Sequence, residues 1–222
     1  KRAPGLPGEF VGHPLCDRYP DMDFRDPQEI SKPPKLLLLP GSRAKEVGRH
    51  LGVMVDAAKR VNATPLIVLP NNSLVAQAKL HVPEISDWDI RVGGLPEALA
   101  DSDLAIASSG TVTLECAWFR VPTVVLYKTS WITYFLGKLF LKVKHIAMPN
   151  LLAECEVFPE YIQRDASADN LAREASRFIH DSARRTQLHD QLGEIIDLLG
   201  RKGAAKRASK AVWRLVDDSV RV

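Results

Sequence analysis

The sequence has few cysteines and no long apolar run. Its three cysteines, Cys16, Cys116 and Cys155, are widely spaced and form no CxxC pair, which argues against a disulfide framework and a zinc site. No segment approaches the ~20 consecutive apolar residues that a membrane-crossing helix needs. No apolar run follows the basic amino terminus, so no signal peptide is predicted. These absences favour a cytoplasmic protein, free in solution or attached to a membrane surface.

The chain also lacks a strong charge of one sign. Its 30 basic and 27 acidic residues give a formal net charge of +3, whereas nucleic-acid-binding domains usually carry a marked basic stripe. Nucleic acid is therefore not an expected partner. The sequence contains no metal-ligand cluster, no Walker loop, no dinucleotide-binding glycine fingerprint and no serine-hydrolase set of residues. No metal site is expected.

Short apolar segments alternate with helical patterns along most of the 222 residues. Five segments are predicted strands, most of them continuous apolar runs typical of strands buried on both faces: Lys35–Leu39, 65–69, Asp89–Val92, 104–107 and 122–127. Helical spacing falls between them, at residues 46–61, 72–79, 95–100 and 111–119. This alternation predicts an α/β fold, a doubly wound, Rossmann-like parallel sheet with helices on both faces.

Composition divides the chain into three predicted parts. Residues 1–34 are rich in Pro and Gly and are predicted to be a linker or interdomain lead. Residues 35–166 are predicted to form the Rossmann-like domain, and residues 167–222 a tail that is helical throughout. The chain starts at Lys1 without an initiator Met, which suggests a fragment, a processed product or one half of a larger protein.

The first predicted strand ends in a loop with binding chemistry. Gly41 allows close backbone approach, Ser42 is suited to cap the following helix, and Arg43 is suited to pair with a phosphate or carboxylate. The alternative is an ordinary strand-to-helix turn with a surface pair between Arg43 and Glu46. The binding interpretation is favoured because a second such loop follows a neighbouring strand.

That second loop, residues 108–115, is the most informative stretch of the sequence. Ser109, Gly110 and Thr111 lead from a strand into a helix, where backbone N–H groups can receive a phosphate. Glu115 lies about one helical turn further on, where its carboxylate can accept hydrogen bonds from sugar hydroxyls. The alternative is a capping box that only fixes the helix start. An anion site one turn from a hydroxyl acceptor suits a ribose diphosphate, so residues 35–166 are predicted to bind a nucleotide sugar.

Four further residues are weaker candidates for the same site. A Gly-Gly turn before Leu95 can bring the Leu95 backbone to the edge of a base, or be a simple turn. Lys128 follows the fifth strand and can meet a diphosphate, although a solvated lysine is the default. Asn150 suits either a sugar contact or a plain helix cap. For Gln163 a surface position is a better explanation than a sugar contact.

Residues 131–145 are apolar and aromatic with spaced lysines. Such a segment is typical of an interfacial membrane helix, with aromatic rings at the lipid boundary and lysines toward headgroups. A buried amphipathic helix and a dimer contact have the same pattern, so the three explanations stay open.

Taken together, these motifs resemble the lipid-A-disaccharide synthase family. The strings that carry the resemblance are Leu-Leu-Leu-Leu-Pro-Gly-Ser-Arg at residues 36–43 with Glu46, Ser-Gly-Thr at 109–111 with Leu-Glu at 114–115, Val-Val at 124–125 with Tyr-Lys at 127–128, Thr-Tyr at 133–134, and Pro-Asn-Leu-Leu-Ala at 149–153. Residues 10–15 also look like the bridge between the two halves of that family. The resemblance runs from about residue 10 to residue 163; the helical tail is similar only in character.

The resemblance implies the two-domain GT-B fold and the transfer of diacylglucosamine from UDP to diacylglucosamine 1-phosphate. UDP-diacylglucosamine would be the donor substrate, bound by the carboxyl-terminal half without a separate cofactor. Implied contacts, residue by residue, are Gly41, Ser42, Arg43, Ser109, Gly110 and Thr111 around the diphosphate, Glu115 at the ribose, the Leu95 backbone at the uracil, and Asn150 and Gln163 at the donor sugar. Arg43 and Lys128 would offset charge on the leaving UDP, which is a catalytic role.

The chain departs from this family because the family's amino-terminal domain is missing. That domain is expected to supply the acceptor site and the general base. The lone chain is therefore expected to bind UDP but to transfer sugar poorly, and the family implies a homodimer and lipid substrates at the inner membrane. The alternatives are a UDP-binding half-domain without catalysis, a lipid II-type transferase, or a UDP-N-acetylglucosamine 2-epimerase.

Overall fold

The structure is a computed structural model that describes residues 8–19, 24–129 and 144–220, with side chains described as far as residue 214. The described chain divides into two compact units: Phe24–Ile195, and a smaller unit that combines Lys1–Asp23 with Ile196–Val222. The expectations for residues 131–143, including the interfacial helix, lie outside the described residues. Each unit is described by itself.

The larger unit is built on six parallel strands. They are ordered β3-β2-β1-β4-β5-β6 in the sheet, and every neighbouring pair is parallel. The strands are β1 (Lys35–Leu39), β2 (Thr64–Leu69), β3 (Asp89–Val92), β4 (Leu104–Ser108), β5 (Thr123–Tyr127) and β6 (Glu160–Ile162). The predicted doubly wound parallel sheet is confirmed. The sixth strand was not predicted, because three residues of intermediate burial have no apolar run.

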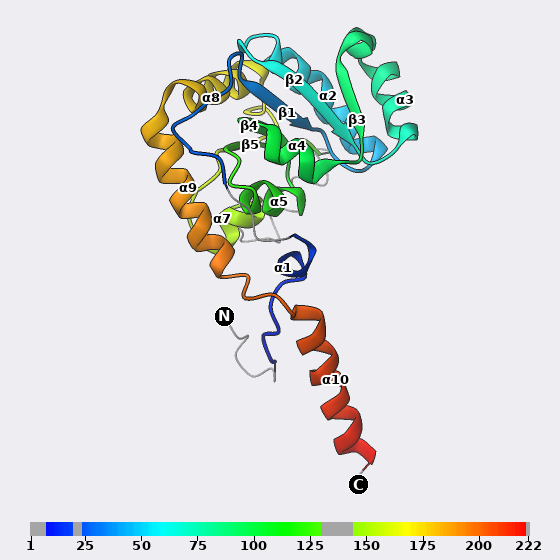
Figure 1. The fold of residues 1–222 in the computed structure, drawn as a ribbon. Coiled ribbons are helices and arrows are strands. Elements are labelled where there is room, and N and C mark those ends of the chain that lie inside the picture. The colour runs from blue at the N-terminus through cyan, green and yellow to red at the C-terminus, as the bar shows by residue number, and fades with distance from the viewer. Residues whose placement is uncertain (1–7, 20–23, 130–143, 221–222) are drawn as a thin grey trace. The chain divides into compact units, whose positions relative to one another are not determined.

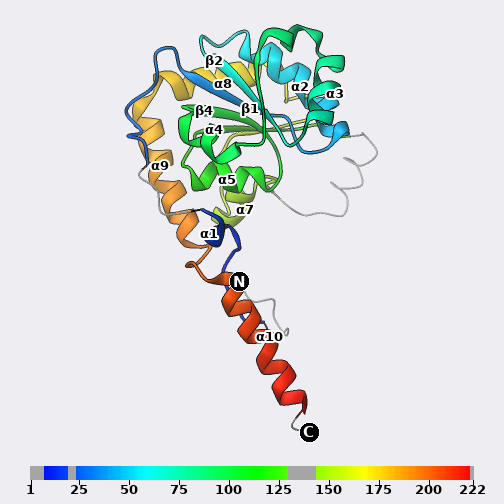
Figure 2. The same cartoon turned by 45° about the vertical axis from the view of Figure 1, so that its right-hand side comes forward.

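Helices cover both faces of this sheet (Figure 1). One layer consists of α2 (Ala44–Ala58), α3 (Asn72–His81) and α8 (Ala168–His180), and α2 contacts both of the others. The other layer consists of α4 (Leu95–Asp101), α5 (Val112–Trp118) and α7 (Met148–Ala153), which lie together in both views (Figure 2). A short 3-10 helix, Pro83–Asp87, precedes β3. Because both faces are covered, the central strands are buried and apolar: Leu36 to Leu38 have no exposed surface.

The tail is helical, as predicted, and it is divided between separate helices. The chain leaves α8 at Asp181 in an extended conformation, and α9 (Ser182–Asp197) begins immediately afterwards. Before α10 (Ala204–Val220), Gly200 and Gly203 have φ of +88° and +94°, values that end a right-handed helix. The compact larger unit includes α8 and most of α9. The boundaries at residues 34 and 166 remain a prediction for the functional domains.

The smaller unit joins the described start of the chain to α10. The Asp17 carboxylate on α1 (Leu15–Arg18) accepts hydrogen bonds from the backbone N–H groups of Gly203 and Ala205, the latter at 3.0 Å. These bonds lower the pKa of Asp17 and cap the amino terminus of α10. Arg207 on α10 donates in return to the Val11 carbonyl at 2.8 Å.

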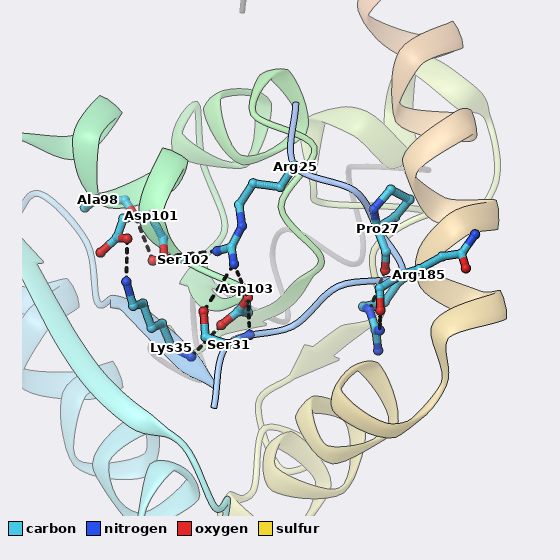
Figure 3. A network of polar contacts seen from close by, with 10 residues as sticks. Arg25, Pro27, Ser31, Lys35, Ala98, Asp101, Ser102, Asp103 and Arg185 are labelled. Atoms are coloured by element: carbon cyan, nitrogen blue, oxygen red, sulfur yellow. Dashed lines mark hydrogen bonds and ion pairs between the residues drawn. The ribbon is translucent and has the colours of Figure 1, made fainter. Parts of the chain in front are cut away.

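The segment before β1 is fixed to the amino-terminal edge of the sheet (Figure 3). The Asp103 carboxylate, at the start of β4, accepts hydrogen bonds from the backbone N–H groups of Ser31 at 3.1 Å and Lys35 at 2.8 Å. It also pairs with Arg25 at 3.1 Å, while its side chain is only 2% exposed. On the same segment, Arg185 of α9 donates to the Pro27 carbonyl at 2.8 Å. Residues 24–34, predicted as a linker, are therefore part of the larger unit and are held against its sheet.

Replacing Asp103 with Ala removes this buried acceptor and leaves two backbone N–H groups without their partner. We expect the free energy of unfolding to fall by about 2 kcal/mol, measured by urea denaturation. Asp101→Ala is the matched control, because its pair with Lys35 is half exposed and should contribute less than about 1 kcal/mol. Equal losses in the two variants would show that the Asp103 network does not fix this segment.

Candidate functional site

Three loops meet at the carboxyl-terminal edge of the sheet. β1 and β4 are paired so that Leu39 lies opposite Ala107, and β4 and β5 so that Ser108 lies opposite Leu126. The loops that follow β1, β4 and β5 therefore leave the sheet side by side. The strand order reverses between β1 and β4, because the chain winds outward from β1 to β3 and then crosses back to β4. Ligands of doubly wound sheets bind at such a switch point.

The loop after β1 is organised by Glu46. Its Oε2 accepts hydrogen bonds from the Ser42 N–H at 3.0 Å and the Arg43 N–H at 3.3 Å, and its Oε1 pairs with Arg43 Nη1 at 2.9 Å. The expectation that Ser42 caps α2 is corrected. Arg43 occupies the N-cap position, and the carboxylate from the first turn supplies the hydrogen bonds. The Arg43 side chain remains 80% exposed, so its guanidinium is accessible at the rim of the sheet.

Gly41 permits this arrangement. Its φ is +127°, a conformation that L-residues with a side chain rarely adopt. A Cβ built at Gly41 would lie 2.6 Å from both Cβ and Oε2 of Glu46. Only glycine lets the Glu46 carboxylate come this close to the loop.

Hydrogen bonds fix the base of the loop after β4, and the outer part of this loop is exposed. The Ser109 N–H continues the sheet by donating to the Leu126 carbonyl at 3.0 Å, and Ser109 Oγ donates to the Ile146 carbonyl at 2.9 Å. Thr113 Oγ1 donates to the Gly110 carbonyl at 2.7 Å. The outer residues of this loop, Gly110 and Thr111, are exposed. A Cβ built at Gly110 would meet no atom of the described residues within 4 Å, so there is room here for a ligand.

Glu115 lies on the first turn of α5, as predicted, and is buried with 8% of its surface exposed. The capping alternative required a side-chain bond at the helix start. In the part of the chain that the structure describes, the Thr111 side chain makes no such bond at the N-cap. The Thr111 side chain therefore does not form the N-cap bond of a capping box.

Leu95 lies further from the loops that follow β1 and β4. It opens α4 directly after Gly93 and Gly94, whose φ values of +71° and +63° make the tight turn that the sequence indicated. Because β3 is two strands from β1, the turn lies toward the far side of the switch point. α4 then runs back and contacts β1. Leu95 therefore lies at one end of the rim.

Asn150 is committed to the interior. Its side chain has no exposed surface and donates to the Phe158 carbonyl at 2.7 Å and Glu160 Oε1 at 2.8 Å. Its Oδ1 accepts from the N–H groups of Val157 at 3.0 Å and Phe158 at 2.8 Å. Both donors and both acceptor positions are used, so no part of the amide is left for a sugar. Asn150 is not a helix cap either, because Ala147 occupies the N-cap of α7.

Gln163 joins the ends of two strands. Its Oε1 accepts from the Thr129 N–H at 2.9 Å and its Nε2 donates to the Thr129 carbonyl at 3.1 Å. Gln163 follows β6 and Thr129 follows β5. The amide therefore fixes the chain just beyond Lys128, at the edge where the loops converge.

The structure adds one residue that the sequence did not suggest, His50 on α2. Its imidazole is 1% exposed, with Nδ1 3.0 Å from the Pro40 carbonyl and Nε2 3.1 Å from the Lys128 N–H. Burial lowers the pKa of His50, which favours the neutral ring. The signal was present in the sequence, since His50 lies between Val47 and Leu51 on the apolar face of the helix.

The described residues show two further properties. No group of three or more His, Cys, Asp or Glu side chains among them is arranged to hold a metal ion. Over the same residues, every helix is too short or too polar to span a bilayer.

Two solved structures show the class of this fold. A UDP-GlcNAc 2-epimerase from Neisseria meningitidis bound to UDP-GlcNAc aligns with a TM-score of 0.54 at 14% identity, covering 83% of this chain and 46% of that one. A spinosyn rhamnosyltransferase aligns with a TM-score of 0.52 at 13% identity, covering 86% of this chain and 48% of that one. The chain has the fold of the carboxyl-terminal, Rossmann-like domain of GT-B proteins.

Sequence comparison identifies the family. The family described as lipid-A-disaccharide synthetase matches residues 2–213. A lipid-A-disaccharide synthase of Myxococcus xanthus is 36% identical over 97% of this chain and 59% of its own length. One from Solibacter usitatus is 33% identical over 99% of this chain and 60% of its own length. The chain belongs to the lipid-A-disaccharide synthase family, and it spans about three fifths of the length of these relatives.

Gly41→Ala tests whether the first loop depends on close approach to Glu46. We expect a loss of about 1–3 kcal/mol in the free energy of unfolding, because the Cβ imposes strain and displaces the carboxylate. Gly52→Ala is the matched control: Gly52 lies inside α2, where a Cβ meets no described atom within 4 Å, so stability should rise by about 0.5–1 kcal/mol. Opposite shifts in urea denaturation are expected; shifts of the same sign would argue against this account of Gly41.

Proposed function

We propose that this chain is the donor-binding part of a lipid-A-disaccharide synthase and binds UDP-diacylglucosamine through its UDP group. The observation that carries the proposal is the convergence of the loops after β1, β4 and β5 at the switch point of the sheet, in a member of this family. One solved relative of the fold is bound to UDP-GlcNAc, a ligand of the same class.

The diphosphate is assigned to the loops that follow β1 and β4. Arg43 offers an exposed guanidinium, whose planar donors match phosphate oxygens. Gly110 and Thr111 form the open face of the second loop, and Ser109 fixes its base through bonds to the Leu126 and Ile146 carbonyls. A diphosphate bound here replaces the Glu46 carboxylate as the anion facing Arg43, or joins it on the exposed side of the guanidinium.

The nucleoside is assigned to the neighbouring groups. The Glu115 carboxylate accepts hydrogen bonds from the ribose hydroxyls, one helical turn from the phosphate loop. The Leu95 backbone contacts the edge of the uracil at the far end of the rim. Asn150 and Gln163 act on the donor sugar indirectly. The Asn150 amide bonds to Glu160, whose carboxylate accepts from the Ile146 and Ala147 N–H groups, and the Gln163 amide holds the backbone of Thr129.

The reaction follows from the family. The anomeric carbon of diacylglucosamine loses its bond to UDP and forms one to a hydroxyl of diacylglucosamine 1-phosphate, which gives the lipid A disaccharide and UDP. Arg43 and Lys128 stabilise the negative charge that develops on the leaving diphosphate, and this electrostatic contribution needs no metal. The general base belongs to the part of the relatives that this chain does not span. The proposal includes a cytoplasmic location, peripheral at the inner face of the inner membrane, and a homodimer.

Titration with UDP tests the donor site. Arg43→Ala should weaken binding about 10- to 100-fold, because a charge-assisted contact to phosphate is lost. Glu115→Gln should also weaken it, since the amide keeps the shape but loses acceptor strength. Arg60→Ala, which removes an equal charge at the opposite end of α2, should leave affinity unchanged. Calorimetry showing no UDP binding by the folded wild-type chain would overturn the proposal.

Transfer is a separate test. With UDP-diacylglucosamine and diacylglucosamine 1-phosphate supplied, we expect the 222-residue chain to bind the donor but form little disaccharide. Adding the amino-terminal part of the Myxococcus xanthus relative should raise turnover. Rapid turnover by the chain alone would contradict the assignment of the general base to the unmatched part of the relatives.

A further inference from the structure

His50 connects two loops that the sheet itself does not connect. Its ring reaches the carbonyl of Pro40, directly after β1, and the backbone N–H of Lys128, directly after β5. β1 and β5 are not neighbours in the sheet, because β4 lies between them and pairs with both. The imidazole is thus a direct link between the first loop and Lys128.

The hydrogen bonds assign the tautomer. A carbonyl only accepts, so Nδ1 carries the proton that it donates to Pro40 at 3.0 Å. A backbone N–H only donates, so Nε2 uses its lone pair to accept from Lys128 at 3.1 Å. A second proton on Nε2 would turn that nitrogen toward the Lys128 carbonyl, 3.2 Å away, and remove the acceptor of the Lys128 N–H.

The surroundings keep the ring neutral. Desolvation is the largest influence on its pKa and lowers it from the ordinary 6.5. The charged groups that face it act in opposite directions, with Glu46 raising the pKa and Lys128 lowering it. The Tyr127 ring lies beside it, with centroids 6.2 Å apart. A neutral imidazole can keep one donor and one acceptor in fixed positions, which a charged ring cannot.

We propose that His50 is a positioning residue of the donor site, which holds the Gly41–Arg43 loop and Lys128 at a fixed separation so that Arg43 and Lys128 act on the same diphosphate. The inference rests on the proposed UDP site and adds a residue to it. His50 is buried and does not touch the ligand. It acts through the backbone groups at both ends of its ring.

His50→Leu removes both hydrogen bonds while keeping an apolar side chain of similar size on the buried face of α2. UDP affinity should fall about tenfold, because misaligned loops should lose a contribution to binding comparable with that of one hydrogen bond. Met54→Leu is the matched control, because Met54 lies one turn along the same helix face with no exposed surface. It alters core packing without touching the loops, and its UDP affinity should equal that of the wild type.

Two conservative variants separate the ends of the link. An Asn amide nitrogen lies near the place of Nδ1, so His50→Asn keeps the donor to Pro40 and loses the acceptor for Lys128. A Gln amide reaches toward the place of Nε2, so His50→Gln keeps the contact with Lys128. Each should bind UDP more tightly than His50→Leu and more weakly than the wild type. Affinities equal to the wild type in all three variants would overturn the proposal.

Two readouts distinguish positioning from a purely structural role. Nitrogen NMR of the imidazole should show Nδ1 protonated and Nε2 with a free lone pair at pH 7, with and without UDP; the opposite tautomer would contradict the proposal. Urea denaturation should show that wild-type stability falls as pH drops below about 6.5, because the unfolded His50 takes up a proton first. His50→Leu should lose less over that range. Weaker UDP binding by His50→Leu at pH 7, where that variant remains folded, indicates a positioning role.

The experiment also separates this inference from the proposed function. If the wild-type chain does not bind UDP, the proposed function fails. If the wild type binds UDP and His50→Leu binds it equally well, the donor site stands and the positioning role fails.

Discussion

The pairing of β1 with β4 at the point where the strand order reverses is the constraint on which the site depends. Parallel strands in register end at the same edge, so the residues after Leu39 and Ser108 must emerge together. The helices on both faces bury these strands, and side-chain packing against the helices fixes that register. The loop chemistry is then a consequence of position: whatever follows β1, β4 and β5 lines one rim.

Within that rim, anionic and cationic groups are already paired before a ligand arrives. Glu46 holds two backbone N–H groups and the Arg43 guanidinium, an arrangement that a phosphate can imitate or extend. Behind it, neutral His50 and the Gln163 amide fix the backbone on either side of Lys128. Preorganisation of this kind lowers the entropy that binding must overcome. The rim therefore resembles a site whose geometry is set by buried side chains and whose charge is presented by exposed ones.

The sequence predicted the sheet and the main loops because both leave local signals. Apolar runs such as Lys35–Leu39 mark buried strands, and Gly41 marks a backbone conformation that only glycine favours. It did not predict β6, whose three residues are stabilised by pairing with β5. Nor did it predict the roles of Asn150 and His50. Those roles depend on groups brought close by tertiary contacts, such as Phe158 and Lys128, so no local pattern reveals them.

The central claim is that these loops jointly hold a UDP group, and amide NMR during a UDP titration tests it most directly. The account predicts chemical-shift changes at Arg43, Gly110 and Thr111 that saturate together with one dissociation constant. The amides of Ser31 and Lys35, on the opposite edge of the sheet, should not change. Shifts confined to one loop, or spread equally to the opposite edge, would contradict a shared diphosphate site.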